Sequence, residues 1–271
     1  MSVTMQGMAG ERAAVSEAEV TADVAVGDEA RPPVLVGCSH GTDDPAGRAV
    51  VRALLDDVRR AAPGLDVREA FVDVQEPAVA DVVRDVANDG GDAVVVPLLL
   101  SGGYHVHVDV AQAVRRDAER PGASSAESGR SAASGPLGPD GRLVAILADR
   151  LHEAGLGPGD GVVLAAAGSS DARSSGDVEA VAGALSLTLA RPVEVGYGSI
   201  ARPSVPEAVA AARAGLPEGG RVVVAAYLLA PGFFLDKVRA AGADVVTAPL
   251  APDRRLTAIV LDRYSGVVAS A

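Results

Sequence analysis

Aromatic side chains are scarce in this chain: they make up 3% of the 271 residues, and tryptophan is absent. This composition argues against the stacked aromatic platforms that hold single-stranded nucleic acids. One cysteine excludes an internal disulfide framework and favours a reducing, cytoplasmic location. No uncharged apolar run reaches the roughly 20 residues that cross a bilayer, so we expect no membrane partner.

Positive charge is also in short supply. Lys and Arg number 24 against 36 Asp and Glu, the net charge is −12, and no basic cluster stands out. We therefore expect no nucleic-acid partner, and an anionic ligand would need a local group of cations. The polar, acidic, Ala- and Gly-rich residues 1–31 predict a disordered leader and not a secretory signal.

Short Ala- and Val-rich runs are abundant, and apolar residues make up 48% of the chain. Apolar strand patterns such as 33–40 and 92–100 alternate with helical patterns such as 46–62 and 76–91. This alternation is typical of βαβ units around a buried parallel sheet. We therefore predict an α/β fold.

The pattern occurs twice. The stretches PLGPDGRLVAILADRL and PLAPDRRLTAIVLDRY agree at most positions, and the apolar runs before them correspond as well. We predict two tandem, similar doubly wound parallel-sheet domains, 32–156 and 157–266, facing a central cleft, with a tail at 267–271. The Gly/Ser/Ala/Pro-rich stretch at about 119–135 predicts a flexible insertion in the first domain.

The two copies differ in residues that carry chemistry. Three polar residues of the first copy are replaced in the second: His40 by Ala167, Asp73 by Ser199 and His105 by Phe234. Apolar core positions, in contrast, change only among apolar types. Losing three polar groups together suggests that one site was kept and its twin abandoned.

The three polar residues follow three strands of the predicted sheet. Ligands of open α/β sheets bind beyond the carboxyl ends of the strands, where His40, Asp73 and His105 would meet. Two imidazoles and a carboxylate form a common ligand set for divalent iron, cobalt, nickel or zinc. We predict a metal site at this edge, with Gly102 and Gly103 allowing the backbone to approach a ligand closely.

Other interpretations of these residues remain open. Cys38 and His40, together with His105 and His107, could form a closed zinc site. Cys38 could equally be a small buried hydrophobe, and a strand-end histidine could simply be a hydrogen-bonded structural group. His107 could face the site or solvent, and His152, within a helical pattern, is expected on the surface.

Three stretches, LVGCSHGTDDPAG, EAFVDVQEPAVADVV and VVVPLLLSGGYHVHVDV, resemble the signatures of the sirohydrochlorin chelatases. These class II chelatases insert cobalt or ferrous iron during cobalamin or sirohaem synthesis. The resemblance covers residues 33–264 in a fused two-unit form. It implies that His40 and His105 are the metal-binding and catalytic pair, and Asp73 stands where the family often has glutamate.

The resemblance implies insertion of Co²⁺ or Fe²⁺ into sirohydrochlorin, with the metal as substrate and no permanently bound cofactor. Tyr104 could pack on the macrocycle, and Arg48 could meet its carboxylates; a core tyrosine and a solvated helix arginine are the plain alternatives. Because the fused repeat already supplies two lobes, we expect a monomer or a homodimer. A non-catalytic two-lobed metal- or tetrapyrrole-binding protein, or a metal-dependent hydrolase, are the competing functions.

Overall fold

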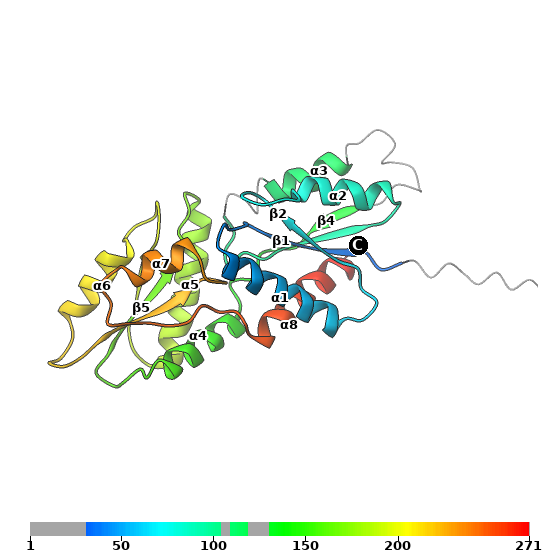
Figure 1. Ribbon diagram of the computed structural model, residues 1–271. Coiled ribbons are helices and arrows are strands. Elements are labelled where there is room, and N and C mark those ends of the chain that lie inside the picture. Colours follow the sequence, from blue (N-terminus) through cyan, green and yellow to red (C-terminus); the bar gives the residue numbers. More distant parts are fainter. Residues whose placement is uncertain (1–30, 104–108, 119–129, 271) are drawn as a thin grey trace, which may run out of the picture. The chain divides into compact units, whose positions relative to one another are not determined.

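The computed structural model describes residues 31–103, 109–118 and 130–270. The residues from Pro32 onward form one compact unit with two four-stranded parallel sheets (Figure 1), which confirms the predicted two-unit α/β fold. None of the helices in these ranges combines the length and apolarity needed to cross a bilayer.

Each sheet is built from one half of the chain. In the first half lie β1 (Val34–Ser39), α1 (Pro45–Ala61), β2 (Val67–Phe71), α2 (Val79–Asn88), β3 (Ala93–Pro97), α3 (Ala111–Ala118), β4 (Ser131–Ala133) and α4 (Gly141–Glu153). In the second half lie β5 (Gly161–Ala166), α5 (Ala172–Leu189), β6 (Val193–Tyr197), α6 (Val205–Ala214), β7 (Val222–Tyr227), α7 (Phe233–Arg239), β8 (Val245–Val246) and α8 (Arg254–Val268). The strand orders, β2-β1-β3-β4 and β6-β5-β7-β8, are the same.

Both faces of the first sheet are covered, which explains why β1 and β3 are buried throughout and, apart from Ser39 at the end of β1, lack polar side chains. Alternate residues of β1 enter different clusters: Val36 packs with α2 and α3, whereas Leu35 packs with α1 and α8. α1 begins where Asp44 caps its first turn, with Asp44 Oδ1 accepting from Ala46 N at 2.8 Å, and Pro45 opens the helix.

One strand lies where the sequence predicts a flexible insertion. Residues 131–133 form β4 and pair in parallel with β3, with Ala93 opposite Ser131. This strand follows from backbone hydrogen bonds at the edge of β3 and from Arg130 N donating to Asp92 Oδ1 at 2.6 Å. A run of small residues gives no periodic signal of such pairing. The prediction of a flexible insertion at about 119–135 is therefore corrected for residues 131–133, which form a strand. Residues 119–129 of the same prediction lie outside the described ranges.

The last helix of each half packs on the sheet of the other half. α4 contacts α5 and β7, whereas α8 contacts α1 and β3 (Figure 1). Two equivalent ion pairs join these helices: Arg142 to Asp262 at 2.6 Å, and Arg255 to Asp149 at 2.7 Å. One hydrophobic cluster therefore includes residues of both sheets, and packing crosses the boundary between the two sequence repeats.

The strand order places a ligand site at a defined edge. The chain leaves β1 to form β2 on one side and β3 on the other, so the connections diverge at the carboxyl ends of β1 and β3. Ligands of open α/β sheets bind at such a point. The same reversal occurs between β5 and β7 of the second sheet.

Candidate functional site

His40 is the first residue after β1 and is half-buried. The end of β2 is held against it by the backbone. Val72 N donates to Ser39 O at 3.0 Å, and Asp73 N donates to His40 O at 3.2 Å. The structure therefore brings His40 and Asp73, which are 33 positions apart, to the same edge of the first sheet.

The turn after His40 depends on glycine. Gly41 has φ +91°, and a Cβ there would lie 2.5 Å from Asp73 O, so a side chain would have to displace the neighbouring turn. Thr42 N then donates to Gln75 Oε1 at 2.9 Å. The loops after β1 and β2 are thus tied together on both sides of the glycine.

The carboxylate of Asp73 lies on the exposed rim of this edge. Its Oδ1 accepts from Val74 N at 2.8 Å. Val74 is a β-branched residue with φ 59°, a strained conformation, and it is 48% exposed. The equivalent Ile200 has φ 51°, so the strain belongs to this type of turn and not to the histidine-bearing copy alone.

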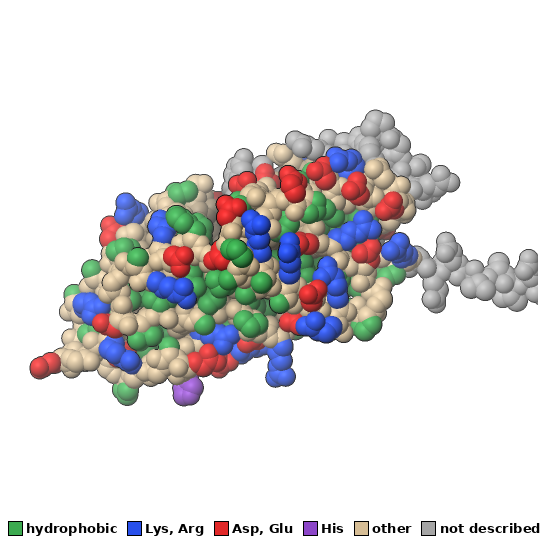
Figure 2. All heavy atoms as spheres, viewed as in Figure 1, with side chains coloured by type: hydrophobic (Ala, Val, Ile, Leu, Met, Phe, Trp, Pro, Cys, Tyr) green, Lys and Arg blue, Asp and Glu red, His purple; other side chains and the backbone are tan. Residues whose placement is uncertain are grey.

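Arg48 braces the same loop. Its Nε donates to Thr42 O at 2.7 Å, and its Nη2 pairs with Asp43 Oδ1 at 3.2 Å. The side chain is 38% exposed and lies in the first turns of α1. On the face of the molecule drawn in Figure 2, acidic and basic side chains are intermingled.

The two candidate glycines approach the second half of the chain. Gly102 N donates to Asp177 Oδ2 at 2.7 Å, and a Cβ on Gly103 would lie 3.3 Å from Ser169 Oγ. Both contacts involve α5 or the loop that leads into it. The backbone at Gly102 and Gly103 is therefore closely approached, and in the structure the approaching side chains are Asp177 and Ser169 of the second copy.

Tyr104, His105 and His107 lie outside the described residues. Among the residues that the structure describes, no group of three His, Cys, Asp or Glu side chains is placed to hold a metal ion. His152 is exposed on α4, as expected from the sequence.

Cys38 packs inside the first sheet and has no exposed surface. Burial, with a smaller contribution from Asp109, raises the pKa of its thiol to about 12. A neutral thiol surrounded by apolar side chains such as Val36 and Ala70 is a small core residue and a poor metal ligand.

The strand registers give a second alignment of the two copies. β1 pairs Ser39 with Phe71, and β5 pairs Ala166 with Tyr197; β1 pairs Val34 with Ala93, and β5 pairs Gly161 with Val222. Continuing along the chain from these pairs reproduces the three replacements found by sequence: His40 by Ala167, Asp73 by Ser199 and His105 by Phe234.

In the second copy the residues equivalent to His40, Asp73 and His105 lie close to one another. Ser199 Oγ donates to Ala167 O at 2.9 Å. The ring of Phe234 packs against Gly198, where a Cβ would lie 3.0 Å from Phe234 Cδ1. The edge that carries His40 in the first copy is therefore filled by an apolar ring in the second.

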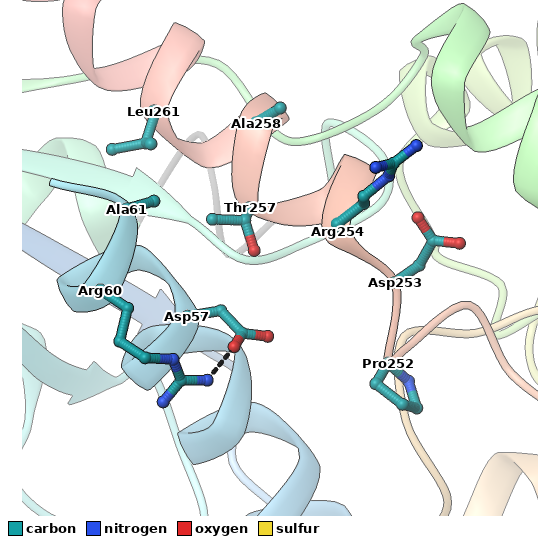
Figure 3. A pocket seen from close by; sticks show the side chains of 9 residues that line it. All are labelled: Asp57, Arg60, Ala61, Pro252, Asp253, Arg254, Thr257, Ala258 and Leu261. Carbon is teal, nitrogen blue, oxygen red and sulfur yellow. Dashed lines mark hydrogen bonds and ion pairs between the residues drawn. The ribbon is translucent and has the colours of Figure 1, made fainter.

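A groove of about 670 Å³ lies elsewhere, between the end of α1 and the start of α8 (Figure 3). The residues that line it are Asp57, Arg60, Ala61, Pro252, Asp253, Arg254, Thr257, Ala258 and Leu261. None of them belongs to the loops that follow β1, β2 and β3, so the groove is separate from the His40 edge.

Sequence reasoning missed two residues of the candidate site. Gln75 joins the loops after β1 and β2, and it stands opposite Ala201 in the second copy. The comparison of the copies that singled out His40 would have found it. Asp177 lies within a helical pattern far from the histidines in sequence, and only its contact with Gly102 reveals its place.

Comparisons with known proteins match both halves of the chain. The CbiX family model matches residues 34–154 and again residues 161–267. A sirohydrochlorin cobaltochelatase of Methanopyrus kandleri is 29% identical over 137 residues, which cover 45% of this chain and 94% of that protein. A sirohydrochlorin cobaltochelatase of Sulfolobus acidocaldarius is 25% identical over 116 residues, which cover 42% of this chain and 86% of that protein.

Two solved structures share the fold. SirB from Bacillus subtilis with Fe³⁺ has a TM-score of 0.69 at 21% identity, covering 86% of this chain and 94% of SirB. CbiX, described as the terminal enzyme for biosynthesis of siroheme in denitrifying bacteria, has a TM-score of 0.57 at 21% identity, covering 86% of this chain and 98% of that one. Because the family model matches both halves, and the curated relatives each match about one half, this chain belongs to the CbiX family of sirohydrochlorin chelatases in a fused, two-copy form.

Proposed function

We propose that this protein inserts a divalent metal ion, Co²⁺ or Fe²⁺, into sirohydrochlorin. The observation that carries the proposal is the single histidine edge. His40 lies at the carboxyl end of β1, where the strand order reverses, and the equivalent edge of the second copy has Ala167 and the ring of Phe234. Two curated relatives named sirohydrochlorin cobaltochelatase support the same substrate.

The reaction needs groups that handle both a metal ion and protons. The macrocycle must lose two pyrrole N–H protons as the ion enters. An imidazole has a pKa near neutrality, so it can accept a proton, and in its neutral form it can bind a metal ion. A site that binds the ion through only a few protein ligands can also release it, whereas a closed four-thiolate site would retain it.

We assign His40 and His105 to the incoming ion, with His105 as the base. His105 lies outside the described residues, and the support comes from its counterpart. Phe234 packs against Gly198, beside Ala167 and Ser199, which stand for His40 and Asp73 in the second copy.

We assign Asp73 to orienting an imidazole or receiving protons. Its backbone is tied to His40, and its carboxylate lies on the rim of the same edge. Arg48 braces the loop after His40, and its partly exposed guanidinium is the group we assign to a carboxylate of the macrocycle. The proposed place of the macrocycle is the predicted cleft between the copies, next to Gly102, Gly103 and Tyr104.

The experiment measures metallation of metal-free sirohydrochlorin by absorbance, with Co²⁺ in one series and with Fe²⁺ under anaerobic conditions in the other. The wild-type rate must exceed the uncatalysed rate. Loss of even an outer-shell partner of a metal ligand costs about 10- to 100-fold in metal affinity or activity, so His40→Ala, which removes an assigned ligand itself, is expected to lower the rate by at least about 100-fold. The matched control is His152→Ala, an exposed histidine on α4, which should retain the wild-type rate.

The same measurements separate the competing function. A carrier or tetrapyrrole-binding protein would bind Co²⁺ or the macrocycle and produce no metallated product above the uncatalysed rate. Retained turnover in His40→Ala would refute the assignment of this residue.

A further inference from the structure

The loop between β3 and the stretch that contains His105 is held by the second copy of the fold. Three hydrogen bonds join them: Tyr227 OH to Leu100 O at 2.8 Å, Ser101 Oγ to Ser174 Oγ at 2.8 Å, and Gly102 N to Asp177 Oδ2 at 2.7 Å. The first copy supplies backbone groups and one hydroxyl, and the second copy supplies the side chains of β7 and α5. The loop that borders the candidate site is thus positioned from outside its own sheet.

The twin loop after β7 has none of these groups. When the two copies are aligned by their strand registers, Pro231 is equivalent to Gly102 and Val50 is equivalent to Asp177. Proline has no backbone N–H to donate, and the valine side chain has no atom that could accept a hydrogen bond. There, Pro231 O instead approaches Gly47, where a Cβ would lie 2.6 Å away, so the twin contact is a close backbone packing.

The other two side chains of the second copy that hold the loop are also replaced by residues without a side-chain hydroxyl. Ser174 corresponds to Gly47, and Tyr227 corresponds to Leu98. Polar contacts between the copies therefore occur on the loop that leads to His105 and are replaced by apolar or backbone contacts on the loop that leads to Phe234. The three hydrogen bonds are therefore specific to the loop before His105 and are not a general feature of how the two copies pack.

The strongest of the three contacts is the bond from Gly102 N to the Asp177 carboxylate. A hydrogen bond with an ionised acceptor is about twice as strong as a neutral one. Asp177 is half-buried in the second turn of α5, and Gly102 is buried. The neighbouring phenol of Tyr227 stays protonated, because burial, followed by the charges of Asp177 and Asp140, raises its pKa.

We propose that Asp177, contributed by the copy that lacks the histidines, is a positioning residue that holds the loop 98–103 in the conformation that metal binding and metallation require. The inference rests on the proposed function. It gives the second copy a role in a reaction whose histidines lie in the first.

The test compares Asp177→Ala and Asp177→Asn with the control Glu179→Ala, an exposed carboxylate on the same helix. Cobalt absorption bands give the Co²⁺ affinity, and steady-state metallation gives kcat and KM for Co²⁺. Loss of a hydrogen bond to a charged group corresponds to about a tenfold to hundredfold change, so Asp177→Ala should weaken Co²⁺ affinity and lower kcat by at least about tenfold. Asp177→Asn retains an acceptor oxygen and should recover part of both losses, whereas Glu179→Ala should match the wild type.

Denaturant unfolding of each variant shows whether a loss reflects global instability. If Asp177→Ala does not fold, Asp177→Asn decides, with a smaller loss expected in both quantities. Wild-type Co²⁺ affinity and kcat in a folded Asp177 variant would overturn the positioning role while leaving the proposed function intact. A wild-type protein that binds Co²⁺ without metallating sirohydrochlorin would overturn the proposed function alone, and the affinity series would still decide the role of Asp177.

Discussion

Replacing Gly41 by alanine tests the geometry of the loop after β1. At φ +91° an L-residue is strained, which costs about 1–2 kcal/mol. The added Cβ would lie 2.5 Å from Asp73 O, and forcing an extra carbon into a packed site costs about 1–3 kcal/mol. Together these costs should lower the free energy of unfolding by about 2–5 kcal/mol.

The chain contains its own control for this substitution. Gly168 occupies the equivalent position in the second copy, with φ +89°, and a Cβ there would collide with Ser199 O. Gly168→Ala should therefore destabilise the protein by a similar amount. The assay is denaturant unfolding, and for a domain of this size each kcal/mol also lowers Tm by about 2–4 °C.

Only the substitution beside the histidine should change the chemistry. Because the Cβ of Gly41→Ala would push the turn at Asp73 away from His40, Co²⁺ affinity should fall by at least about tenfold, measured where both variants are folded. Gly168→Ala should keep wild-type affinity. Equal losses of affinity in both variants, or unchanged stability of Gly41→Ala, would show that the reasoning about this loop is wrong.

Three further predictions concern stability. Arg221, as the main hydrogen-bond donor, holds the pKa of Asp160 well below its usual range. The carboxylate therefore stabilises the fold above about pH 4, and this contribution is lost as the pH falls through the lower native pKa. Asp160→Asn should be less stable than the wild type at pH 7. The difference between the urea midpoints of the two proteins should shrink toward about pH 3. Leu147 is a fully buried residue of α4, and Leu147→Ala should cost about 2–5 kcal/mol. Because α4 packs on the second sheet, hydrogen exchange should show the lost protection mainly in α5 and β7; loss confined to the first sheet would contradict the exchange of helices. Asp140→Ala and Asp253→Ala, which remove equivalent helix N-caps, should each cost about 0.5–2 kcal/mol in thermal unfolding, and a cost at only one position would show that the two caps are not equivalent.

Much of the fold could be predicted because its signals are local or repeated. Apolar runs such as 92–100 can be recognised without any tertiary information, and the repeated segments showed that the second half copies the first. β4 gave no such signal, because Ser131–Ala133 becomes a strand through pairing with the edge of β3. The exchange of α4 and α8 was equally hidden, since each helix has the same amphipathic pattern whichever sheet it covers.

The candidate site shows the same division. His40 could be predicted because it interrupts an apolar pattern and is replaced by Ala167 in a chain that supplies its own comparison. By itself the sequence determined the fold class, the duplication and the copy that kept its polar groups, because these depend on residue types and their order. Only the tertiary structure decided that Asp177 of the second copy holds Gly102 of the first, because contacts between distant segments depend on how two sheets pack and leave no periodic trace in either segment.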